Sequence, residues 1–443
     1  MIPARSFATA LLVAASCLSV ASAAPQPIDL ATTLRLAGAD NLSVKIAQEK
    51  LAEARADADI AREKLFPWVT AGLGFRQHDN NSQTVEGRII DADKRSFSTG
   101  IGLNAQWDFG EVYYQKLAAM QRVRAEEAAF SVQHQTSVTD AALAYYELLR
   151  ATATIDIAND ALELSSRHTM QLTAAAGSGL VFAGDVQRLA TARARHEAAV
   201  AQAREQARIA AARLAELLKL DPATDLTPAA AELIPVVLVS PTADLAALVA
   251  RALAARPELT QADARLAAAR EQNRGARTAP LIPGVSAQAN FGGLGGEPGH
   301  GSWSRGFDVS NDYALGLGWR IGPGGLFDRS RVRSSDARLR RGELELEQTR
   351  DAIRRQVVEF HARAQSLSGQ LGSLRTALDA ATKTADLSRE RRAQAVSNAF
   401  EDLVAEEELT RARRDYVTAV AQSAQAQHAL LRVLGGEIAA RSP

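Results

Sequence analysis

The chain has 443 residues, of which 51 are Lys or Arg and 51 are Asp or Glu, and its isoelectric point is near 7.1. This balance leaves no basic excess and argues against a nucleic-acid-binding protein. Aromatic residues make up only 5% of the chain, which is low for an enzyme core, whereas abundant alanine among charged residues favours long, closely packed helices.

Residues 1–23 are interpreted as a signal peptide. An apolar run at 7–16 precedes small residues that end at Ala23, where we expect cleavage. The segment is too short to cross a membrane as a helix. The only cysteine, Cys17, is either discarded with it or becomes a lipid anchor, since 14–17 resembles a lipobox. Both outcomes predict an exported protein.

The first two strands are expected at about 67–76 and 97–109. In 97–109 (FSTGIGLNAQWDF), apolar side chains and Thr99 occupy the odd positions and polar residues or glycine the even ones, which is typical of a strand with one apolar face. Both stretches have the length of a strand that crosses a bilayer at a tilt, and aromatic residues lie at their ends, as in membrane-interface girdles. The sequence therefore favours membrane-spanning strands.

A very long helix is expected next, at about 112–177, because this stretch contains no proline and little glycine. At 1.5 Å per residue it would be about 100 Å long. Shorter helices at 28–65 and 185–220 could stack end to end beside it, with a turn, or tip, at about 178–185. Helices this long fit a hollow helical barrel better than a globular core.

The chain contains an internal duplication. Residues 30–55 align with 245–270, and the next strand begins with Pro67 in one copy and Pro283 in the other. In the second copy we expect strands at about 284–292 and 313–321, a glycine-rich loop at 292–311, and a second tip at about 395–402. The expected divisions are a first repeat at 24–221, a proline-rich linker at 222–243 on the outside, a second repeat at 244–436 and a tail at 437–443.

Four strands in one chain cannot close a barrel, and their unpaired edges could not face lipid. Three chains would give twelve strands, within the known size range of membrane barrels. The polar faces would then line a water-filled lumen. The alternative is a soluble sheet that buries its apolar face, in a periplasmic coiled-coil adaptor or scaffold protein without a membrane-spanning barrel.

No motif points to catalysis. The seven histidines lack metal-binding H-x-x-x-H spacing, and the chain has no G-x-S-x-G nucleophile elbow. His134, His168 and His196 lie on polar helices and are expected to face solvent. We therefore expect no enzyme activity, no cofactor and no metal.

The duplicated helix–strand–strand–helix order resembles the TolC-type outer-membrane efflux proteins, also called outer-membrane factors, over about 28–436. The sharpest match is 179–194, which resembles the family's Gly-Leu-Val-x-x-x-Asp-Val turn at the periplasmic tip. The second tip lacks the glycine, and Glu401 or Asp402 stands where the acidic residue belongs. In the first tip the pattern falls on Gly179, Leu180, Val181, Asp185 and Val186.

The resemblance implies a mainly helical fold: a homotrimer whose twelve-stranded β-barrel lies in the lipid of a Gram-negative outer membrane and continues into a long periplasmic α-helical barrel. It implies an exit duct for small molecules or ions. The implied partners are a periplasmic adaptor (membrane fusion) protein and an inner-membrane pump of the RND, ABC or MFS type.

Two roles remain open for the tip residues. Asp185 either caps the returning helix or, with Glu401 and Asp402, rings a narrow periplasmic aperture in three copies. The apolar residues Leu180, Val181 and Val186 either pack the helical hairpin or contact the adaptor. Gly179 suits a positive φ angle after a long helix.

Overall fold

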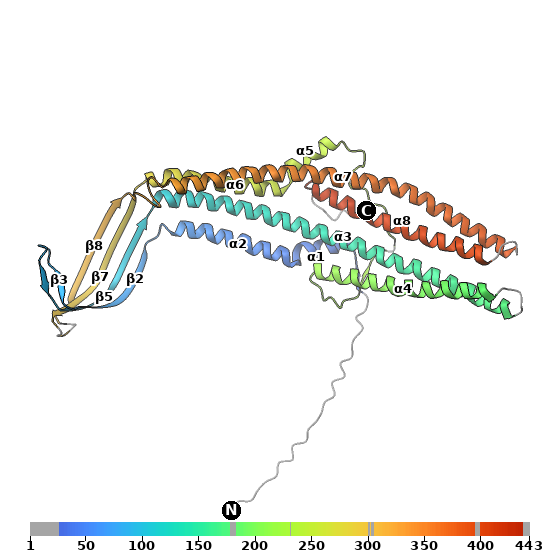
Figure 1. Ribbon diagram of the computed structural model, residues 1–443, viewed down its shortest axis with the longest axis horizontal. Helices are drawn as coiled ribbons and strands as arrows, with labels where there is room; N and C mark the ends of the chain where they lie inside the picture. Colours follow the sequence, from blue (N-terminus) through green and yellow to red (C-terminus); the bar gives the residue numbers. More distant parts are fainter. Residues whose placement is uncertain are drawn as a thin grey trace, which may run out of the picture.

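The computed structural model describes residues 26–177, 183–230, 232–299, 302, 305–394 and 399–436. The protomer is a long rod with a β-sheet at one end and two helical hairpins at the other (Figure 1). Several expectations fall outside the described residues: the signal peptide at 1–23, Cys17, Gly179, Leu180, Val181 and the tail at 437–443.

Helices account for most of the chain, because alanine, leucine, arginine and glutamate dominate their sequences. The longest, α3, has 69 residues and begins at Phe109, three residues earlier than the expected 112. The α-helices are α1 (Leu30–Asp40), α2 (Leu42–Glu63), α3 (Phe109–Gly177), α4 (Ala183–Leu217), α5 (Leu245–Ala255), α6 (Pro257–Thr278), α7 (Arg329–Ala393) and α8 (Ala399–Val433), and a short 3-10 helix, η1, covers Ala279–Leu281.

The helix expected over 28–65 is divided at Asn41. Its backbone leaves the helical region, with φ −59° and ψ 129°, and its side-chain oxygen accepts a hydrogen bond from the Ser43 N–H at 2.8 Å. The amide nitrogen of Asn41 also donates to the Leu217 carbonyl at 3.0 Å. Asn41 therefore ends α1, begins α2 and ties both to the end of α4.

The main sheet has four antiparallel strands in the order β2-β5-β7-β8. Short connections join β2 to β5 and β7 to β8, whereas α3 to α6 lie between β5 and β7. The strands are β2 (Trp68–His78), β5 (Lys94–Trp107), β7 (Gly284–Pro298) and β8 (Asp308–Gly318). Two small pairs accompany it: β3 (Asn81–Gln83) with β4 (Ile89–Asp91), and β1 (Gln26–Ile28) with β6 (Leu226–Pro228).

The glycine-rich stretch expected to be a loop from residue 292 instead continues β7 to Pro298. Gly292 lies opposite Gly100 of β5, and a Cβ atom added to Gly292 would lie 2.7 Å from the Gly100 Cα. Only glycine permits this approach of the two backbones. These glycines thus serve strand pairing rather than loop flexibility.

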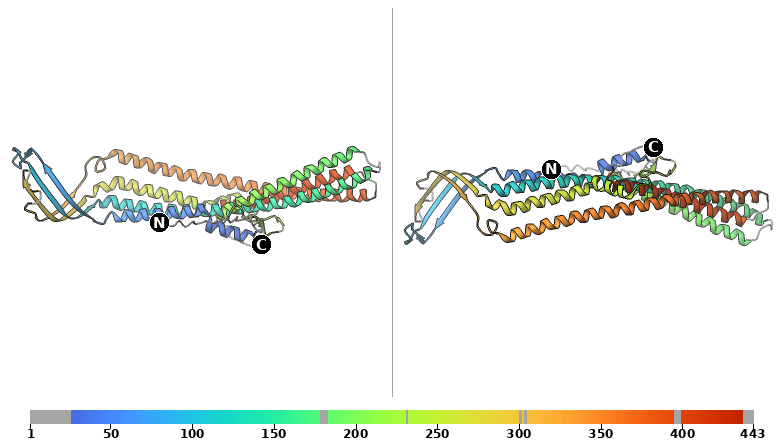
Figure 2. Two further views of the ribbon diagram at one scale, coloured as in Figure 1. Left: turned by 90° about the horizontal axis from the view of Figure 1, so that it is seen from below. Right: turned by 90° about the horizontal axis from the view of Figure 1, so that it is seen from above.

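In the half nearest the sheet, α2, α3, α6 and α7 lie side by side in one layer (Figure 2). In the other half, α3 forms a hairpin with α4, and α7 forms one with α8 (Figures 1 and 2). Among the described residues, every helix is too short or too polar to span a bilayer.

Two apolar cores lie near the middle of the rod. One gathers Tyr145 and Leu148 of α3 with Leu214 of α4, and the other gathers Val357 of α7 with Leu430 of α8. The two cores come from corresponding helices of the two repeats, so the duplication is also visible in packing. The linker between the repeats lies against the second core, where Val239 is buried.

Candidate pore lining and helical tip

One face of the four-stranded sheet is apolar and exposed over most of its length, with Phe307 lying over it only near Gly293 and Gly295. On the edge strands, Leu73 is 76% exposed and Leu315 is 82% exposed. Figure 1 shows the sheet extending beyond the ends of the helices, so no helix packs on it. An exposed apolar face of this length is what a membrane-spanning sheet presents to lipid.

The opposite face is polar and carries small residues. Asn104 donates a hydrogen bond from its side-chain amide to the Thr70 hydroxyl at 3.1 Å, across the β2-β5 pair. Gln288 lies opposite Asn104, and Asn290 lies opposite Asp312. This face suits a water-filled lumen because each of these groups can hydrogen-bond to water.

Two tryptophans fix the sheet to the helices in the same way in both repeats. The Trp107 indole N–H donates to the Leu65 carbonyl at 2.7 Å, and the Trp319 indole N–H donates to the Leu281 carbonyl at 3.1 Å. Each carbonyl lies two residues before the proline that opens the next strand. Aromatic residues at strand ends predict a place at the membrane interface, but the pattern gives no sign of these two hydrogen bonds.

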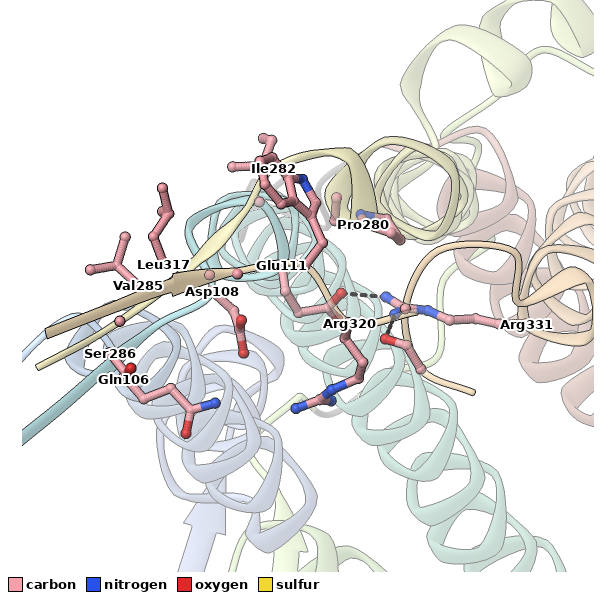
Figure 3. Close-up of a pocket in the computed structure, with 18 residues that line it drawn as sticks. Gln106, Asp108, Glu111, Pro280, Ile282, Val285, Ser286, Leu317, Arg320 and Arg331 are labelled. Carbon is pink, nitrogen blue, oxygen red and sulfur yellow. Dashed lines mark hydrogen bonds and ion pairs between the residues drawn. The ribbon is translucent and has the colours of Figure 1, made fainter. Parts of the chain in front are cut away.

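An ion pair joins the two long helices where the sheet meets them. Glu111 in the first turn of α3 pairs with Arg331 in the first turn of α7, whose guanidinium also donates to the Gly324 carbonyl at 3.4 Å (Figure 3). The pair borders a pocket of about 760 Å³. Asp108 and Arg320 also line this pocket, from the ends of β5 and β8.

At the helical tip, Asp402 is fully buried, which differs from the expected place at an aperture. Its Oδ2 atom lies 2.7 Å from an Arg392 guanidinium nitrogen and 3.4 Å from His168 Nε2. The same guanidinium donates to the Gln171 side-chain oxygen. Because the carboxylate is enclosed between α3, α7 and α8, it does not line a lumen in this conformation.

His168 was expected to face solvent, but it is buried beside Asp402. Burial lowers the pKa of His168, and the neighbouring Arg392 lowers it further. Nearby, burial raises the pKa of Glu406, whose carboxylate lies 3.2 Å from Arg389. The sequence pattern of α3 does not predict the burial of His168, because the groups that enclose this side chain come from two distant helices.

The other described tip residues are more exposed. Asp185 lies in the first turn of α4, with its carboxylate 3.5 Å from Arg188. Glu401 lies in the first turn of α8, 3.9 Å from Arg391. Val186 is half-buried against Leu172, Leu189 and Leu403 at the end of the hairpins.

No residue arrangement in the described ranges suggests a metal centre, since no three His, Cys, Asp or Glu side chains lie close enough to share an ion. The features assembled here are a two-faced sheet, a junction ion pair and a charged helical tip.

Comparison with known proteins identifies a family for this chain. The family model for outer membrane efflux proteins matches residues 33–218 and 248–436. No curated protein matches the chain.

Several solved structures share the fold. A membrane protein from Pseudomonas aeruginosa is 21% identical with a TM-score of 0.76, over 92% of this chain and 93% of that one. The Campylobacter jejuni CmeC outer membrane channel is 14% identical with a TM-score of 0.77, over 92% and 85%. The Vibrio cholerae outer membrane protein VceC is 20% identical with a TM-score of 0.73, over 92% and 96%. This chain therefore belongs to the outer membrane efflux protein family, whose members are channels of the outer membrane.

Proposed function

We propose that three copies of this chain form the exit duct of a tripartite system that moves small molecules or ions to the cell exterior. The observation that carries the proposal is the sheet, which has two unpaired edges and an exposed apolar face. Unpaired backbone groups are costly in lipid, so four strands need partner strands from other copies. Three copies supply twelve strands.

The helical half continues this duct into the periplasm. The layer of α2, α3, α6 and α7 would repeat around the same threefold axis and enclose a hollow barrel. At the far end, the tip contacts a periplasmic adaptor through Gly179, Leu180, Val181, Asp185 and Val186, and the adaptor joins an inner-membrane pump of the RND, ABC or MFS type. The duct itself performs no chemistry.

In three copies, Asp185 and Glu401 surround the periplasmic aperture. The buried Asp402 instead stabilises each tip through its ion pair with Arg392. Adaptor binding opens the aperture only if the adaptor binds the open state more tightly than the closed one. We expect Asp185→Ala to raise leak conductance in planar bilayers. Glu205→Ala, on the same helix but further from the tip, is the control, and equal conductance for the two variants would contradict the ring.

A soluble adaptor or scaffold is the competing function, and membrane extraction separates the two. We expect the chain to stay in the membrane fraction through alkaline carbonate and urea washes, because its strands contact lipid. The Cys17→Ser variant is tested in parallel, since a lipid anchor at Cys17 could hold a scaffold on the membrane. Release of that variant by the washes would favour the scaffold.

A further inference from the structure

The two outer strands of the sheet, β2 and β8, each have one edge without a partner. We propose that β8 pairs antiparallel with β2 of the next copy in one defined register, with Leu315 opposite Leu73 and Asp312 opposite Arg76. This seam rests on the proposed trimeric barrel and adds the residue pairs that close it. The nearest alternative registers of β8 against β2 are shifted by two residues, because a shift of one residue would turn the apolar face of the strand inward.

The duplicated tryptophans supply the first argument. Within the protomer, the two repeats meet at the β5-β7 pair, where Trp107 lies opposite Val285. Trp319 is the equivalent of Trp107 in the second repeat. Both indole N–H groups donate to a carbonyl that lies two residues before a proline, Pro67 in the first repeat and Pro283 in the second. Val69 occupies the place of Val285, because each lies two residues after that proline. The equivalent seam between copies therefore sets Trp319 opposite Val69.

Charge complementarity supplies the second argument. From the Trp319–Val69 pair, seven residues back along β8 and seven residues forward along β2 bring Asp312 opposite Arg76 of the next copy. Both side chains belong to the polar face and are exposed in the protomer, and neither makes a hydrogen bond or ion pair with another described residue. The register chosen from the tryptophans thus joins an unpaired anion to an unpaired cation on the lumen side.

Barrel geometry supplies the third argument. Hydrogen-bonded neighbours lead across the sheet from Thr70 through Gly102 and Asn290 to Asp312. Across the seam, Asp312 then lies opposite Arg76 of the next copy. A path that follows paired residues across one copy therefore starts at residue 70 of β2 and arrives six residues further along β2 of the next copy, at residue 76. Over three copies this advance gives a strand tilt of about 47°, using a rise of about 3.4 Å and a strand spacing of about 4.8 Å.

The neighbouring registers fit less well. A two-residue shift that sets Asp312 opposite His78 gives a tilt of about 55°, about 10° above the roughly 45° of membrane strands, whereas the proposed register lies about 2° above it. The opposite shift gives about 35° but sets Asp312 opposite Gly74, which leaves the charge without a partner. Only the proposed register satisfies the tilt, the charges and the tryptophans together.

The same register gives Arg320 a partner. Figure 3 shows its guanidinium apart from the Glu111–Arg331 ion pair, and it forms no hydrogen bond or ion pair within the described part of the protomer. Across the seam it lies opposite Trp68, which is 51% exposed in the protomer. A cation–π contact between these side chains would close the seam at its periplasmic end.

Cysteine cross-linking tests the register directly. Leu315→Cys is combined in turn with Leu73→Cys, with Phe75→Cys or with Ala71→Cys, and the membranes are oxidised. We expect covalently linked copies only with Leu73→Cys, because directly opposite Cα atoms lie within disulfide range and diagonal ones do not. The single-cysteine variants control for Cys17. Cross-linking with Phe75→Cys or Ala71→Cys instead would overturn the register.

Charge reversal tests the ion pair. Asp312→Lys and Arg76→Asp should each lower the temperature at which the oligomer dissociates on a semi-native gel, and the double variant should recover most of the loss. Asp308→Lys is the control, which Arg76→Asp should not rescue. No recovery in the double variant would overturn the pair. A trimer without the predicted cross-link refutes the seam alone, whereas a monomeric native mass refutes the proposed function as well.

Discussion

Removing the Arg392 guanidinium should destabilise the helical tip strongly. Arg392→Gln leaves the Asp402 carboxylate fully buried without its 2.7 Å cationic partner, and the Asp402 Oδ1 atom already has no hydrogen-bond partner. Breaking a buried ion pair by deleting one member costs about 3–5 kcal/mol. Local opening of the tip should therefore become roughly a hundred to several thousand times more frequent.

Native-state hydrogen exchange measures this opening at the backbone amides of α8 that follow Asp402. We expect faster exchange there in Arg392→Gln, and unchanged exchange in the middle of the rod, where Leu214 and Leu430 are buried in separate cores. Adding Asp402→Asn should recover part of the loss, because it removes the uncompensated charge.

The exposed pair between Arg193 and Glu197 is the matched control on α4. Its atoms lie 2.9 Å apart, but both side chains are about half exposed, so Glu197→Gln should cost less than about 1 kcal/mol. Equal changes of tip exchange in Arg392→Gln and Glu197→Gln would contradict a stabilising buried ion pair. Absence of any recovery with Asp402→Asn would contradict it as well.

Three further outcomes follow from single polar side chains. Burial lowers the pKa of His428 from 6.5 to about 4, so the folded state disfavours protonation of this side chain. The free energy of unfolding should therefore be full above pH 6.5 and fall by about 3 kcal/mol as the pH drops to 4. His428→Gln should reduce this fall, as measured by thermal unfolding followed by circular dichroism. Trp107→Phe and Trp319→Phe remove one hydrogen bond each and should each cost about 0.5–1.5 kcal/mol in the same assay, with an unchanged midpoint counting against the anchors. Gln427→Ala leaves the N–H groups of residues 238 and 239 unpaired, so limited proteolysis should cut the linker faster, and equal cutting would contradict this role.

Local sequence pattern was enough to identify the four strands of the sheet, because alternation and length are properties of each strand alone, but β8 begins at Asp308, five residues before the expected 313, and ends at Gly318. It misjudged the stretch after residue 292, since glycines that read as a loop serve close backbone approach between β7 and β5. It also missed the break at Asn41, where one capping side chain outweighs the helix-forming residues on both sides.

The tip shows why part of the site could not be predicted. Asp402 lies in the first turn of α8, and its burial depends on Arg392 and His168. His168 lies more than two hundred positions away in the sequence, on α3, and no periodicity links it to α8. Partner groups of this kind emerge only when distant helices pack together.

Native mass spectrometry of the detergent-extracted protein tests most directly whether three copies close one barrel. We expect a complex with three times the mass of one chain that persists after the detergent is removed in the gas phase. A lone protomer, soluble without detergent, would contradict it.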